Sequence, residues 1–385
     1  MNSVVDFALI PLQPNSDLRF FSGASSTVIG SGSIGSTLLI KNLPMSGSFV
    51  NLEWGSFQNF QANYGAGMQK DRLSFSLNMY YKSAKNNFNY KYNGQVFENK
   101  NADQEILGLN ARLAYQLNES SKLEFFYWKQ DADREIPPSK SAVNTEAKQK
   151  DIFNKYIIRF NHLQANNEWQ LQLNYAKDRL LFDDITIEPS DSYVQRLQLD
   201  GFWKYKRNYT IGIQGILDYA DATLFSETFS RSQVALFATQ QFSLNRSWDL
   251  LLSERINWLN TEKLPFTFSA KIEHKLSSEH SINIELERIY NLPGFNDLFW
   301  PVLGNPDLLP ERGFAFNVGS NYKKYFKQNT LFDLHANLFY NRLRDWIVWV
   351  PNEFNVWRPE NARKLRTYGL ELRLTFRKDY KFASW

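Results

Sequence analysis

The chain has 385 residues, contains no cysteine and carries a formal net charge of +4. The absence of cysteine excludes disulfides and thiolate metal sites. Lys and Arg are scattered along the chain, so no basic patch indicates nucleic-acid binding. No stretch approaches the roughly 20 apolar residues of a membrane helix. The opening MNSVVDFALIPLQ lacks a signal-peptide pattern, so we expect that the protein stays in the cytoplasm or that the chain starts late.

The first 45 residues differ from the rest because they are rich in Gly and Ser. Gly30, Gly32 and Gly35 spell G-x-G-x-x-G, the pattern of a dinucleotide-binding turn. That turn must open a helix, whereas the following Ser36 to Ile40 has the composition of a strand. We therefore expect no nucleotide site here, and interpret residues 1–45 as a separate unit or the tail of one.

From about residue 46 onward, apolar and polar residues alternate with a period of two, which predicts strands with one apolar face. The aromatic share of 16% also favours strands. The segments run for about 10 to 13 residues, longer than soluble strands of roughly 5 to 6 and close to a membrane strand of about 9 to 11. The fold class is therefore predicted to be all-β, with roughly 16 antiparallel strands in a transmembrane barrel. A soluble all-β fold is the alternative.

The connections between these segments sort by length. Short polar turns alternate with mostly longer connections, which is typical of outer-membrane barrels with short periplasmic turns and long extracellular loops. The longer connections are predicted at 84–104, 132–150, 181–192, 220–232, 290–312 and 346–364.

The stretch 288–313, RIYNLPGFNDLFWPVLGNPDLLPERG, interrupts the alternation. Its prolines break strands and favour turns. We expect a folded connection between a strand ending near Ile289 and one starting near Phe314, in which Phe299, Trp300 and Leu303 pack on neighbouring loops or on the barrel rim.

No set of residues indicates catalysis, a metal site or a cofactor. The four histidines are all more than four positions apart, and no Ser, His and acid set is marked. Trp300 and Trp357 are possible ligand-loop aromatics. Trp346 and Trp349 either grip a ligand or belong to an outer aromatic girdle, and we favour the girdle.

The interrupting stretch resembles the signature R-x-P-x-x-x-D-L-(F/Y)…G-N-P-x-L-x-P-E of TonB-dependent outer-membrane receptors. The matching residues are Pro293, Asp297, Leu298, Gly304, Asn305, Pro306, Leu308, Pro310 and Glu311. An extra residue, Asn291, makes the match to the arginine approximate. We expect these residues to shape the loop rather than to bind ligand.

Two other segments resemble the same family. Gly23, Gly30, Gly32 and Gly35 are similar to the end of the family's plug domain, although Ser36 stands where the family usually has a second glycine. Gly369 and Glu371, following Asn361, resemble a strand entry of the family's barrel.

The resemblance implies a plugged, 22-stranded barrel in the bacterial outer membrane. It implies active uptake of a scarce solute, such as an iron–siderophore or cobalamin, with the cobalamin branch most similar. The implied partners are outer-membrane lipid, the small solute, and the TonB energy-transducing complex through an N-terminal region missing here.

On this interpretation, residues 1–45 are the C-terminal end of the plug and residues 46–385 are a barrel that is incomplete at its C-terminus. The chain would be a fragment of a receptor. Two alternatives remain open. One is a passive porin-like or adhesin barrel that is complete as it stands, and the other is a soluble carbohydrate-binding β protein.

Overall fold

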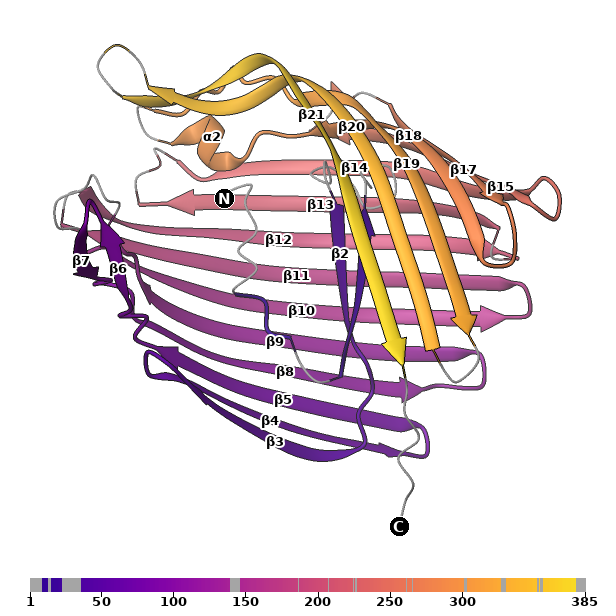
Figure 1. Cartoon of the computed structure of the whole chain (residues 1–385), viewed down its shortest axis with the longest axis horizontal. Coiled ribbons are helices and arrows are strands. Elements are labelled where there is room, and N and C mark those ends of the chain that lie inside the picture. The colour runs from indigo at the N-terminus through magenta and orange to yellow at the C-terminus, as the bar shows by residue number, and fades with distance from the viewer. Residues whose placement is uncertain are drawn as a thin grey trace. The chain divides into compact units, whose positions relative to one another are not determined.

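The computed structural model describes residues 9–12, 15–22, 36–138, 146–185, 187–206, 208–223, 225, 227–260, 262–264, 266–300, 303–326, 330–351, 353 and 356–378. Almost all of this chain is antiparallel strand, with one short helix, α2 (Phe295–Phe299) (Figure 1). No helix in these ranges is long and apolar enough to cross a membrane.

Two compact units divide the chain. Unit 1 comprises residues 1–18, 40–203 and 214–234, and unit 2 comprises residues 19–39, 204–213 and 235–385. The division falls near the end of β12 (Ile187–Tyr205) and within β13 (Tyr209–Ala222) and β14 (Phe229–Ser243). It also falls within β1 (Ser16–Ser22) and β2 (Ser36–Asn42), which form a two-stranded sheet.

Unit 1 is a meander in which each strand pairs with the next strand of the sheet. Its strands are β3 (Gly47–Gly55), β4 (Asn59–Lys70), β5 (Leu73–Ala84), β8 (Gln104–Gln116), β9 (Ser121–Glu135), β10 (Lys148–Gln164), β11 (Asn167–Asp184) and β12 (Ile187–Tyr205). A separate hairpin, β6 (Asn89–Tyr92) and β7 (Gln95–Glu98), lies between β5 and β8 in sequence. Figure 1 shows β8 to β11 running side by side.

Unit 2 continues the same up-and-down pattern. Its strands are β15 (Trp248–Leu259), β16 (Glu262–Lys263), β17 (Thr267–Lys275), β18 (His280–Asn291), β19 (Glu311–Phe326), β20 (Thr330–Pro351) and β21 (Trp357–Lys378). Of the described strands, 16 belong to the main sheets when the two-residue β16 is set aside, in agreement with the predicted number.

Burial along the strands is the reverse of a soluble protein. In unit 2, Leu286 and Leu338 are 40% and 55% exposed, whereas Glu287 and Asn337 beside them are 1% and 5% exposed. Soluble proteins bury apolar side chains and expose charged ones. An exposed apolar face and an inward polar face are the pattern of a strand between lipid and a polar interior, which does not fit the soluble alternative.

Unit 1 shows the same two faces. Its apolar face carries a row of three tyrosines, Tyr127, Tyr156 and Tyr175, which are directly paired across β9, β10 and β11. Their ring centroids are 4.9 Å and 6.1 Å apart. Such a row of amphipathic rings is what an aromatic girdle at a membrane boundary requires.

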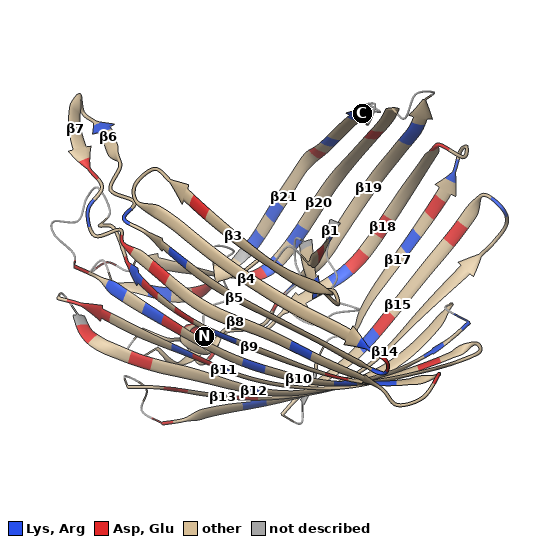
Figure 2. Ribbon diagram, turned by 90° about the horizontal axis from the view of Figure 1, so that it is seen from below, with Lys and Arg blue, Asp and Glu red and all other residues tan. Residues whose placement is uncertain are grey.

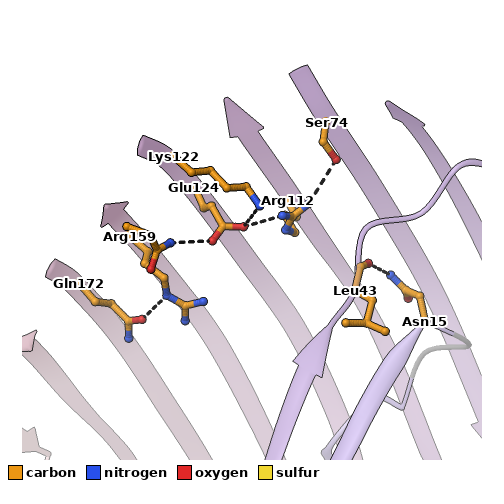
Figure 3. Close-up of polar contacts among 9 residues, drawn as sticks. Asn15, Leu43, Ser74, Arg112, Lys122, Glu124, Arg159 and Gln172 are labelled. Carbon is orange, nitrogen blue, oxygen red and sulfur yellow. Dashed lines mark hydrogen bonds and ion pairs between the residues drawn. The ribbon is translucent and has the colours of Figure 1, made fainter. Parts of the chain in front are cut away.

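The polar face of unit 1 is a hydrogen-bonded network (Figure 3). Glu124, which is 7% exposed, accepts a hydrogen bond from Arg112 at 2.5 Å and one from Asn161 at 3.1 Å. Arg159 donates to Gln172 at 2.6 Å on the next strand. A carboxylate so deeply buried needs such partners, because an unpaired buried charge is costly.

Strand extension shortens several connections relative to the prediction. The predicted connection 181–192 falls almost entirely within β11 and β12, and the predicted connection 346–364 shrinks to residues 352–356 because β20 and β21 have 22 residues each. Backbone pairing continues beyond the apolar band since every N–H and C=O group still needs a partner. The polar residues in these two predicted connections therefore mark the end of the apolar band, whereas the strands continue beyond it.

Candidate functional site

The conspicuous site of unit 2 is the connection between β18 and β19, residues 292–310, called here the motif loop. The flanking strands reach Asn291 and Glu311, which pair directly, so the predicted boundaries near Ile289 and Phe314 were each two to three residues too short. The loop contains α2, which the sequence pattern did not predict.

Asp297 holds the motif loop at two points. Its Oδ2 atom accepts a hydrogen bond of 2.9 Å from the backbone N–H of Gly294, the residue before α2, and its Oδ1 atom accepts one of 3.0 Å from the indole of Trp349 on β20. The first contact satisfies a backbone donor at the helix start. The second joins the helix to β20.

The prediction that Trp349 belongs to an outer aromatic girdle is wrong, because its indole donates a hydrogen bond to the motif loop. Trp346 packs against a buried cluster of Ile289, Ala315 and Leu343 at the ends of β18, β19 and β20. These three residues are 0%, 1% and 2% exposed, so the strands have a dry, close-packed end next to the loop.

The second half of the motif loop is fixed by Asn305 and Gly304. The Oδ1 atom of Asn305 accepts a hydrogen bond of 3.1 Å from the backbone N–H of Asp307. Its Nδ2 atom donates a hydrogen bond of 3.2 Å to the carbonyl of Pro359 on β21. A Cβ atom on Gly304 would lie 2.6 Å from the backbone nitrogen of Trp300. Only glycine fits this approach, which explains the residue type by geometry.

Glu311 closes the loop at the start of β19. Its side chain is buried, and its Oε2 and Oε1 atoms accept hydrogen bonds of 2.9 Å from Asn291 Nδ2 and from the backbone N–H of Ile347. It thus connects three neighbouring strands, β18, β19 and β20. A buried acceptor with two donors is well suited to hold the strand ends in register.

Asn361 on β21 pairs with the motif loop as a strand would. Its Oδ1 atom accepts the N–H of Leu309 at 2.9 Å, and its Nδ2 atom donates to the Leu309 carbonyl at 3.0 Å and to the Asp345 carbonyl at 2.7 Å. The amide side chain thereby satisfies the N–H and C=O groups of Leu309, as the backbone of a neighbouring strand would. The role of Asn361 was not predicted, because its partner lies 52 residues away in sequence.

The remaining predicted residues are distributed as follows. In the motif loop, Pro293 and Leu308 are buried, Leu298, Trp300 and Pro310 are partly buried, and Pro306 is exposed. Trp357, at 52% exposure, starts β21. Gly369 and Glu371 lie further along β21, where they pair with Phe339 and Asn337 and do not meet the loop. Gly23, Gly30, Gly32 and Gly35 lie outside the described residues.

A second feature lies in unit 1, on the polar face. Leu9 is buried against Tyr80, Ile106 and Ala132, and its carbonyl accepts a hydrogen bond of 3.0 Å from the Gln130 amide. Gln130 in turn accepts the Tyr80 hydroxyl at 2.6 Å. The N-terminal segment is therefore held at this point to the inward side of the sheet.

Unit 1 also contains a cavity of about 710 Å³ at the strand ends next to the longer connections. Its lining includes two ion pairs, Lys85 with Asp103 and Lys150 with Asp133 at 2.9 Å. The hydrogen bond to Asp103 raises the pKa of Lys85 above its ordinary value. The lining comes from strands far apart in sequence, so no local motif could have indicated it.

The motif loop, the Leu9 contact and the cavity can hold a loop, a chain segment or a polar ligand, respectively. Among the described residues, no cluster of three or more His, Cys, Asp or Glu side chains is arranged to hold a metal ion.

Residues 46–385 match the family described as TonB dependent receptor-like, beta-barrel. The chain belongs to this family. The match confirms the predicted antiparallel transmembrane β-barrel class and the outer-membrane location, and it places the chain in a family of receptors, which are not enzymes.

Individual relatives of this TonB-dependent receptor chain agree with the family match. The vitamin B12 transporter BtuB of Photobacterium profundum is 21% identical over 394 residues, which cover 96% of this chain and 62% of that transporter. The chain therefore spans less than two thirds of this relative's length.

Two solved structures show the same fold. The siderophore receptor PirA from Pseudomonas aeruginosa has a TM-score of 0.73 at 15% identity, over 93% of this chain and 68% of that one. The Serratia marcescens hemophore receptor HasR, solved as a double mutant with its hemophore HasA and heme, has a TM-score of 0.76 at 11% identity, over 94% and 67%. At these identities the likeness establishes the fold alone.

Proposed function

We propose that this chain forms the barrel part of a receptor that takes up a scarce small solute across the outer membrane, with energy supplied through TonB. We propose active, substrate-specific uptake, as expected of a TonB-dependent receptor, and not passive diffusion through an open pore. The solute class we propose is an iron–siderophore or cobalamin, and the similarity to a vitamin B12 transporter supports the second.

The observation that carries the proposal is the position of Leu9. A passive pore needs a water-filled interior, whereas here a residue from the N-terminal segment is buried on the inward face of unit 1 by Tyr80 and Gln130. This contact supports the assignment of residues 1–45 to the end of a plug domain. The porin-like alternative gives no reason for a buried N-terminal residue there.

The motif loop has a supporting part in this proposal. Asp297, Asn305 and Glu311 each accept or donate hydrogen bonds to neighbouring strands of unit 2, and none has a geometry that leaves its polar atoms free for a ligand. We propose that these residues are architectural and hold the extracellular end of the strands in shape. The exposed Trp357 and the charged cavity of unit 1 are the proposed places for solute contacts.

Uptake in whole cells tests the proposal. The chain, preceded by a complete plug domain with a TonB-contacting segment, would be expressed in a Gram-negative strain that lacks its own receptors, with and without a functional TonB, and supplied with labelled cyanocobalamin, a ferric catecholate, a ferric hydroxamate or heme. We expect saturable uptake of one of these solutes in the TonB-containing strain alone. Uptake equal in both strains would contradict an energy-dependent receptor.

A conductance measurement separates the alternatives. The purified chain would be inserted into a planar lipid bilayer, with a variant lacking residues 1–35 as the comparison. We expect little steady current from the intact chain and a larger current after deletion. A large steady current from the intact chain would favour the porin-like alternative and overturn the proposed role of the N-terminal segment.

A further inference from the structure

The apolar face of unit 2 ends in a cluster of cationic side chains, which the family match does not explain. We propose that this cluster, called here the basic rim, binds the phosphate groups of lipid headgroups in the outer leaflet of the membrane. The basic rim consists of Arg288 on β18, Arg312 on β19, Arg342 and Arg344 on β20, and Lys364 and Arg366 on β21.

Strand register brings these residues together. Arg288 pairs with Phe314, Phe314 pairs with Arg342, and Arg342 pairs with Arg366. One row further along, Arg312 pairs with Arg344, which pairs with Lys364. Directly paired residues of an antiparallel sheet share a face and lie about 5 Å apart. Figure 2 shows Lys and Arg bands running side by side across β20 and β21.

The depth of the rim is set by the apolar row next to it. Phe316, Tyr340 and Tyr368 are directly paired and are 42%, 40% and 79% exposed. Exposed aromatic residues at the edge of an apolar band mark the membrane boundary. Two residues along a strand span about 7 Å, so Arg342 and Arg366 lie one headgroup depth beyond the hydrocarbon. The motif loop lies at this end, which makes it the outer leaflet.

Five of the six charges of the rim are not neutralised by the part of the chain that the structure describes. Arg312 forms an ion pair with Asp345 at 2.9 Å. The other five rim residues form no ion pair or hydrogen bond with the described part of the chain, and four of them, Arg342, Arg344, Lys364 and Arg366, are exposed. The acidic residues next to the rim in sequence, Glu287 and Glu311, are 1% and 4% exposed and belong to the opposite, buried face of the sheet. Glu360 is four positions from Lys364 along β21.

Unit 1 shows that cations at the strand ends do not generally lack a carboxylate partner. Beyond its tyrosine row, Lys129 lies 3.9 Å from Asp131, Lys150 lies 2.9 Å from Asp133, and Arg179 lies 2.5 Å from Asp191. These three cations of unit 1 are thus close to carboxylates of the protein. In the basic rim their counter-charges must come from outside, and the phosphates of the adjacent lipid lie at the same depth as the side chains. Arginine is suited to this contact, since its guanidinium group binds phosphate with two parallel hydrogen bonds.

Native mass spectrometry of the full chain in neutral detergent tests the proposal. The probes are lipid A with two phosphates, lipid A with one phosphate, and phosphatidylcholine, each titrated against the protein. We expect the bisphosphorylated lipid to bind most tightly, and the R342Q/R366Q variant to bind it about 30-fold more weakly, because each cation near a membrane surface changes affinity about fivefold.

The controls separate specific binding from general charge. The variant K91Q/K100Q loses the same charge from exposed positions of unit 1 and should bind as the unmodified chain does. R342K/R366K should restore most of the binding, which excludes a folding defect as the cause. Equal binding by the unmodified chain and R342Q/R366Q, or an equal loss in K91Q/K100Q, would overturn the proposal. Displacement of the lipid by millimolar inorganic phosphate would overturn it in favour of a site for free phosphate.

Discussion

The indole Nε1 atom of Trp349 donates a hydrogen bond of 3.0 Å to the carboxylate of Asp297, across 52 residues of sequence. This contact connects α2 in the motif loop to the extended end of β20. The same carboxylate accepts the N–H of Gly294 at 2.9 Å. One side chain therefore both starts the helix and joins it to the sheet, so the loop depends on it at two points.

Replacing Asp297 by Ala should loosen the motif loop. Two donors, the Gly294 N–H and the Trp349 indole, would lose an acceptor, and hydrogen bonds to charged groups stabilise by about 1.5–3 kcal/mol each. We expect amide hydrogen exchange of residues 294–300 to become at least tenfold faster. Asp307→Ala is the matched control, because Asp307 is exposed and its carboxylate has no hydrogen bond to the described residues. Unchanged exchange in Asp297→Ala would contradict the role assigned to this contact.

A methyl group at position 304 should have a large local effect. The Cβ of Gly304→Ala would lie 2.6 Å from the Trp300 nitrogen and 2.7 Å from the Leu298 carbonyl oxygen, and backbone atoms cannot move aside cheaply. We expect faster cleavage of the loop by a protease added to the detergent-solubilised protein, at a cost of about 1–3 kcal/mol. Gly215→Ala provides the comparison, since a Cβ atom at that position would have nothing within 4 Å. Equal protease resistance in the two variants would refute the explanation.

Glu311 should matter for the stability of the whole strand end. Glu311→Ala leaves the Asn291 amide and the Ile347 N–H without their acceptor, and an unsatisfied buried donor costs about 1–3 kcal/mol. Glu311→Gln keeps one acceptor oxygen and should lose less. The readout is the temperature at which the folded form disappears in unboiled gel electrophoresis. Glu360→Ala, at an exposed position of β21, should leave that temperature unchanged.

The contact of Leu9 with unit 1 can be followed by chemical labelling. The chain contains no cysteine, so Leu9→Cys introduces a unique thiol. We expect slow reaction of this thiol with a maleimide, because Leu9 is 8% exposed, and a faster reaction when Gln130→Ala removes the hydrogen bond to its carbonyl. Gln116→Ala, at the end of β8 in the same unit, is the control and should not change the rate. A fast reaction of Leu9→Cys by itself would show that the segment is not held.

The regular part of the fold could be predicted from sequence because membrane strands obey a local rule. Leu334, Ala336 and Leu338 alternate with His335 and Asn337 along a strand whose two faces meet lipid and a polar interior, so the pattern appears residue by residue. The ends of the strands were less accessible. Pairing of β20 with β21 continues to Pro351 and Trp357, where the side chains no longer alternate and only the backbone partner across the sheet sustains the strand.

By itself, the sequence determined the all-β class, the number of strands and the motif residues, because alternation and turn chemistry are properties of neighbouring residues. Only the tertiary structure decided which distant residues meet: Asp297 with Trp349, Leu309 with Asn361, and the six cations of the basic rim. These contacts depend on strand register. A shift by one residue would move every one of these side chains to the other face of the sheet, and no local pattern within a single strand encodes which residue of the next strand it will face.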